Sequence, residues 1–173
     1  MYDNKNSNTN NKNGNYSNNN NYQNKTNNYQ NKSFDNRPKF TAEFIEKGFR
    51  NDKGKLRPDL FSDEAKNIAL QLARETTSSQ LRSFYGEVKA LQNRMEDEEE
   101  SFEDILPFIL MLKSKADYKY RNGKNQKIPQ VFRDFIFAGV DEIKKINTKQ
   151  GFDDFCYMFE AVVGFIYGIN GGK

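Results

Sequence analysis

From residue 40 onward, apolar residues recur every three or four positions, which is the spacing of helices that bury one face. No stretch alternates between apolar and polar residues for long enough to predict a strand. The pattern therefore predicts an all-α fold, a compact bundle of about five helices.

Capping residues and helix breakers set the expected boundaries. Ser62 is the expected N-cap of one helix, and Thr77 with Gln80 has the spacing of a capping box. Pro107 predicts either a kink or a helix start, and Gly168 a helix end. The expected helices run over 41–47, from 62 onward, from 77 to the acidic run at 96–100, and over 102–121, 129–146 and 149–167.

The last of these helices differs from the others because it is apolar almost all round. It carries Phe152, Phe155, Phe159, Val162 and Ile166 within four turns. A helix of this kind lies at the centre of a bundle or is partly covered by another subunit. Both interpretations stay open from the sequence.

The first 37 residues lack any helical pattern. Fifteen of the first 31 are Asn, and after Met1 no aliphatic residue occurs before Ala42. Such a segment cannot bury enough apolar area to offset its conformational entropy. We therefore expect a disordered Asn-rich tail at 1–37, followed by a helical bundle domain at 38–173.

The composition excludes several kinds of chemistry. The chain has no His and one Cys, so the usual zinc, iron and copper ligands and the His base of nucleophile triads are missing. We expect no metal and no cofactor. Cys156, among aromatic residues, is expected to be a buried core thiol. With no disulfide framework, no secretory signal and no apolar run that could span a bilayer, the expected location is cytoplasmic, without membrane contact.

Positive charge is concentrated in two places. The tail has five cations and two anions, whereas the remaining residues hold 22 of each sign. These remaining residues have no net charge, but within them the segment at 113–133 has a single acid, Asp117. The same segment has seven cations: Lys113, Lys115, Lys119, Arg121, Lys124, Lys127 and Arg133. A basic segment with interleaved tyrosines is typical of sequence-independent phosphate binding. Cations at the end of a helix that only complement its dipole would look the same.

A second polar set lies on the helix after Thr77. Arg82, Gly86, Lys89 and Asn93 follow at steps of four, three and four residues, so they share one helix face. None of the four is acidic, and the glycine leaves room for a phosphate or a sugar.

Two further segments do not support catalysis. The stretch at 48–55 has glycines but lacks the spacing, the Ser or Thr and the preceding strand of a phosphate-binding loop. The acidic residues at 96–104 follow one another on a loop, whereas a metal-dependent nuclease needs inward carboxylates from separate elements. Loss of a metal-dependent hydrolysis on mutating Glu103 and Asp104 would revive an enzymatic interpretation.

Three segments together resemble a known family. They are TTSSQLRSFYGEVKAL at 76–91, ILPFILMLKSKADYKYRNGK at 105–124 and FDDFCYMFEAVVGFIYG at 152–168. In this order they resemble the small subunit of type III-A CRISPR effector ribonucleoproteins, the Csm complexes. The resemblance covers about 70–168 and leaves the Asn-rich tail unmatched.

The resemblance implies a non-catalytic five-helix subunit. Copies of it would line up head to tail as a filament along the guide RNA and its paired target RNA, beside backbone and large subunits that carry out the cleavage. The matching basic positions are Arg82, Lys115 and Lys124, and the charge pattern adds Lys89, Lys119 and Arg121. The small subunit of the type III-B effector and a helical protein–protein adaptor without nucleic acid are the alternatives.

Overall fold

A computed structural model describes residues 39–97, 100–120 and 128–170, and these residues contain helices but no β-strand. The expected all-α fold is therefore confirmed, while the tail at 1–37 lies outside the described residues. The elements are α1 (Phe44–Lys47), the 3-10 turn η1 (Pro58–Phe61), α2 (Asp63–Leu72), α3 (Ser78–Asp97), α4 (Phe102–Tyr120), α5 (Gln130–Ile146) and α6 (Lys149–Asn170).

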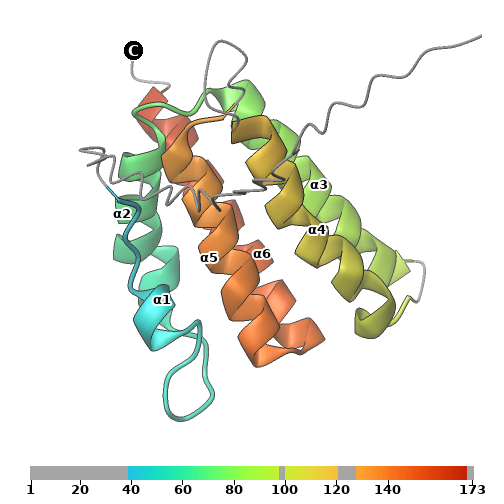
Figure 1. Ribbon diagram of the computed structural model, residues 1–173. Coiled ribbons are helices and arrows are strands. Elements are labelled where there is room, and N and C mark those ends of the chain that lie inside the picture. The colour runs from blue at the N-terminus through green and yellow to red at the C-terminus, as the bar shows by residue number, and fades with distance from the viewer. Residues whose placement is uncertain (1–38, 98–99, 121–127, 171–173) are drawn as a thin grey trace, which may run out of the picture. The chain divides into compact units, whose positions relative to one another are not determined.

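Helix α6 holds the bundle together. It packs against α2, α3 and α5, and α4 packs against α3 and α5. Figure 1 shows α5 and α6 in the middle, with α1 and α2 on one side and α3 and α4 on the other. The apolar residues named above for the last helix are all buried. Of the two interpretations left open for this helix, the central position is correct.

The core around α6 is built mainly from phenylalanine rings. The Phe159 ring lies 5.1 Å from that of Phe135 on α5, and Phe155 lies 5.9 Å from Phe135. Gly139 permits this close contact between α5 and α6, since a Cβ added there would lie 2.1 Å from Cε2 of Phe155. Burial of these large rings supplies most of the driving force for the fold.

One predicted helix cap is confirmed and another is wrong. The Thr77 N–H donates to Oε1 of Gln80 at 2.8 Å, and the Gln80 N–H donates to Oγ1 of Thr77 at 3.2 Å. Ser62 does precede α2, but its side chain makes no capping hydrogen bond. The same residue ends η1 by donating its N–H to the Asp59 carbonyl, and this role holds its backbone outside the usual N-cap conformation.

Two helix ends differ from the expectation. Helix α1 begins at Phe44 instead of residue 41, because the Gln71 side chain hydrogen-bonds both the N–H and the carbonyl of Thr41. Helix α6 continues through Gly168 to Asn170, where the side chain of Ile169 still packs against the core. In both cases a tertiary contact outweighs the local preference.

Candidate nucleic-acid interface

Helix α3 carries the predicted cations Arg82 and Lys89 on the face turned away from the core. Leu81, Phe84 and Val88 are buried, whereas Arg82 and Gly86 are exposed and Lys89 is half-buried. The Nζ of Lys89 donates to Oε1 of Gln92 at 2.8 Å. The amphipathic pattern of α3 thus positions these polar residues simply by burying the opposite side.

Helix α4 brings two further predicted cations to another side of α3. Lys115 and Lys119 are one turn apart, and both donate to the carboxylate of Glu87 on α3, at 2.9 and 3.1 Å. The Lys119 Nζ also lies 4.4 Å from the centroid of the Phe84 ring. These two lysines therefore lie on the α4 side of α3, whereas Arg82 and Lys89 lie toward α6.

Glu87 partly neutralises this pair of lysines. Its partial burial opposes ionisation, but the hydrogen bonds and positive charges of Lys115 and Lys119 outweigh that effect and lower the pKa of the carboxyl group. The carboxylate is therefore ionised at neutral pH, and it holds the two ammonium groups close together. A phosphate reaching this surface would meet two lysines already fixed in position.

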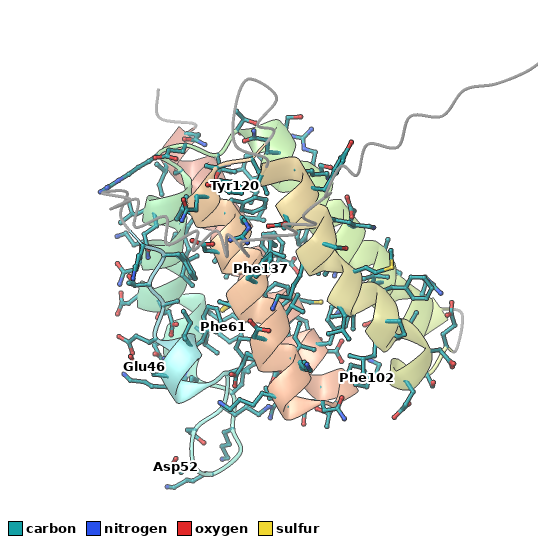
Figure 2. The ribbon with its side chains drawn as sticks, in the orientation of Figure 1. Glu46, Asp52, Phe61, Phe102, Tyr120 and Phe137 are labelled. Atoms are coloured by element: carbon teal, nitrogen blue, oxygen red, sulfur yellow. The ribbon has the colours of Figure 1, made fainter. Side chains whose placement is uncertain are left out.

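The described cations of the basic segment predicted at 113–133 do not form one continuous surface. Lys113 points toward α5, where it donates to Asp141 at 2.7 Å. Arg133 donates to Asp117 at 2.7 Å and lies over the rings of Tyr120 and Phe137. Figure 2 shows these two aromatic residues on the side of the bundle where α4 and α5 meet. Positions 113 and 115 point to nearly opposite sides of α4 because a helix turns by about 100° per residue. Lys113 therefore lies on the α5 side of α4, and Lys115 lies on the α3 side.

Two predicted site residues, Arg121 and Lys124, lie outside the described residues, as does Gly123. Among the described residues, Arg82 and Lys89 therefore lie on the α6 side of α3, and Lys115 and Lys119 lie on its α4 side. The structure says nothing about the remaining two. In the sequence, Arg121 and Lys124 come shortly after Tyr120, the last residue of α4.

Two residues of this surface were not identified from the sequence. Glu87 gives no sequence signal, because its role depends on α4 lying beside α3. Tyr167 of α6 does give a sequence signal, because it falls outside the buried stripe of that helix. In the structure its hydroxyl accepts a hydrogen bond from Nε of Arg82 at 3.2 Å.

A separate cluster of carboxylates is held by an arginine. Glu43, Asp59 and Glu64 offer oxygens close to one another. The Arg57 guanidinium lies among them, with NH2 at 2.6 Å from Glu64 and 3.5 Å from Glu43. It also donates to the Gly48 carbonyl at 2.7 Å. This charge compensation assigns the cluster a structural role, the attachment of α1 to α2.

The acidic stretch before α4 also has a structural role where it is described. The Asp104 carboxylate accepts from the Ser101 hydroxyl at 2.6 Å, and the Asp104 N–H donates back to that hydroxyl at 3.2 Å. Asp104 therefore caps α4 and does not point inward as a metal ligand would. Cys156 is buried as predicted, and burial raises the pKa of its thiol.

None of the described helices combines the length and the apolar character that crossing a bilayer requires. A model of the family described as Csm2 Type III-A matches residues 55–167 of the chain. Neither the curated proteins nor the solved structures give a significant match. The matched region contains α2 to α5, most of α6 and all six predicted site residues.

Proposed function

The chain belongs to the Csm2 Type III-A family of CRISPR effector subunits, and on this premise we propose that it is the non-catalytic RNA-binding small subunit of a type III-A ribonucleoprotein. The family decides between the two effector types that the sequence left open, in favour of III-A. In this proposal the subunit acts in the cytoplasm, together with the backbone and large subunits of the complex.

The observation that carries the proposal is the set of cations around α3. Lys115 and Lys119 flank Glu87, and Arg82 and Lys89 lie on the outer face of the same helix. Lysine and arginine side chains bind phosphates without reading the bases, so this surface suits a guide RNA and its target RNA of any sequence. Arg121 and Lys124, which follow α4, complete the proposed contact set.

Self-association along the RNA is the second part of the proposal. Helix α4 exposes Phe108 and Met111 about one turn apart, with 42% of Phe108 and 48% of Met111 accessible. They line a groove of about 240 Å³ together with Ala90 and Leu91 of α3. Glu87, Arg94 and Lys115 also line this groove, which therefore adjoins the proposed phosphate contact of Lys115. Exposed apolar side chains on adjacent turns of one helix support contact with another copy in a filament.

The test of RNA binding is the salt dependence of affinity for a short single-stranded RNA. We expect the affinity to fall steeply with salt and to change little with base sequence. Replacing Lys115, Lys119 and Arg121 with Gln should weaken binding and reduce the slope of log K against log salt by about 2, because each lost phosphate contact on a single strand contributes about 0.7.

The matched control replaces Lys53, Lys55 and Lys66 with Gln, which removes the same charge from exposed positions in the loop before η1 and on α2. This control should bind RNA like the wild type. Equal weakening by both triple variants would reject the proposed surface. A wild-type protein without RNA affinity at low salt would favour the helical adaptor instead.

A further inference from the structure

Two tyrosines of α6 lie at the edge of the surface just described. Tyr157 and Tyr167 are 48% and 38% exposed, although α6 as a whole is the most buried helix of the bundle. Arg82 of α3 lies beside Tyr167, with its Nε 3.2 Å from the hydroxyl and its guanidinium carbon 6.0 Å from the ring centroid. The exposed aromatic surface of α6 and the cationic face of α3 are therefore continuous.

Two glycines lie between the two tyrosines, beside the side chain of Glu160. Gly164 of α6 and Gly86 of α3 are both exposed, and a Cβ added to either would meet no atom within 4 Å. The two helices are linked on either side of these glycines by Arg82 with Tyr167 and by Tyr85 with Glu160. A planar group can thus approach the helix backbones between the rings.

The two acids of α6 beside this surface are both engaged in hydrogen bonds. The Glu160 carboxylate hydrogen-bonds Tyr85, and the Asp153 carboxylate accepts from Gln92 and from Lys149. The cations Arg82 and Lys89 of α3 can therefore still meet an anion at this surface. Ten residues separate the two tyrosines, which places them about 15 Å apart along the helix axis. At about 3.4 Å per nucleotide along a strand, this distance corresponds to about four nucleotides.

We propose that unpaired bases of single-stranded RNA stack on Tyr157 and Tyr167 while Arg82 and Lys89 contact the adjoining phosphates. This inference rests on the proposed RNA-binding function and adds the form of RNA and two contact residues. Cations combined with exposed aromatic rings are the common arrangement for binding single strands without sequence preference, because every base has a face that can stack. A duplex keeps its bases stacked on one another and cannot use the rings.

The test compares Tyr157→Ser and Tyr167→Ser with Tyr157→Phe and Tyr167→Phe. The probe is a fluorescently labelled single-stranded 12-nucleotide RNA, and a blunt RNA duplex of the same length is measured in parallel. Each Ser variant should weaken single-strand binding about fivefold or more while leaving the salt slope unchanged, since stacking releases no counterions. The Phe variants retain a ring and should bind within about twofold of the wild type. Duplex binding should be unchanged in all four.

Phe61→Ser provides the matched control, because Phe61 is an exposed aromatic residue of η1, outside α3, α4 and α6. Melting temperatures near that of the wild type establish that each variant is folded. If the Ser variants bind like the wild type while the steep salt dependence persists, the stacking inference is wrong and the proposed function stands. If the wild type binds neither RNA, both are wrong. Equal loss with duplex and single strand would also reject stacking.

Discussion

The guanidinium of Arg50 forms a two-point ion pair with the carboxylate of Asp154, 104 residues later in the chain. Its Nε lies 2.6 Å from one carboxylate oxygen and its NH2 2.7 Å from the other. Asp154 is buried in α6, whereas Arg50 belongs to the loop between α1 and η1. This pair therefore attaches that loop to the central helix. The glycine-containing stretch at 48–55 thus has a structural role, as the connection between α1 and η1.

Replacing Asp154 with Asn should lower the free energy of unfolding by about 2 kcal/mol, because Arg50 would lose its buried counter-charge while the shape of the side chain is kept. Urea unfolding followed by circular dichroism measures this change. Lys47→Gln removes an exposed ion pair to Glu43 and should lower the free energy of unfolding much less than Asp154→Asn does. Similar losses for the two variants would show that burial adds nothing to the Arg50 pair.

Gly139→Ala should destabilise the fold by about 2 kcal/mol, because the added methyl group would overlap the Phe155 ring and push α5 away from α6. Gly164→Ala is the matched control. Its Cβ has open space in an exposed part of α6, so the variant should gain up to about 1 kcal/mol from helix propensity. Thermal unfolding of both variants measures the difference, and a stable Gly139→Ala protein would contradict the close packing of the two helices.

Glu87→Gln should bind single-stranded RNA several-fold more tightly than the wild type, since it removes the carboxylate that competes with phosphate for Lys115 and Lys119. Fluorescence anisotropy at fixed salt measures the affinity. Glu46→Gln, the same substitution at an exposed position of α1, separates the loss of this contact from the general change in net charge. A larger gain with Glu46→Gln would contradict a role for the two lysines.

The same variant should change how stability depends on pH. The pKa of Glu87 is lowered in the folded protein, so its ionised form stabilises the fold above the unfolded-state value of about 4.3. This contribution is lost as the pH falls through the lower folded-state pKa. The stability difference between wild type and Glu87→Gln should therefore shrink as the pH is lowered from 6 to 3, as followed by urea midpoints. A constant difference would indicate that the ion pairs do not contribute.

Met111→Glu should weaken self-association, because it places a charge in the exposed apolar face of α4. Sedimentation velocity over a range of protein concentrations measures the oligomers. Gln150→Glu adds the same charge at an exposed position at the start of α6 and should leave the oligomers unchanged. Unaltered assembly of Met111→Glu would remove this face from the proposed filament contact.

The helices could be predicted from the sequence because each depends on a local pattern of apolar spacing and caps. Thr77 and Gln80 lie three positions apart and interact as their spacing predicts. The cationic surface could be predicted only in part, because its composition depends on neighbours in space. The basic segment contains a single acid, Asp117. In the folded protein, however, its lysines also contact Glu87 of α3 and Asp141 of α5. The helix ends at Phe44 and Asn170 likewise depend on tertiary contacts.

The central position of α6 has a consequence for synthesis on the ribosome. Helices α2 and α3 pack against α6, which occupies residues 149–170. Until those residues leave the exit tunnel, the apolar faces of α2 and α3 lack this native partner. The bundle is therefore completed only once α6 has emerged, and a chain truncated before Phe152 should remain dependent on chaperones.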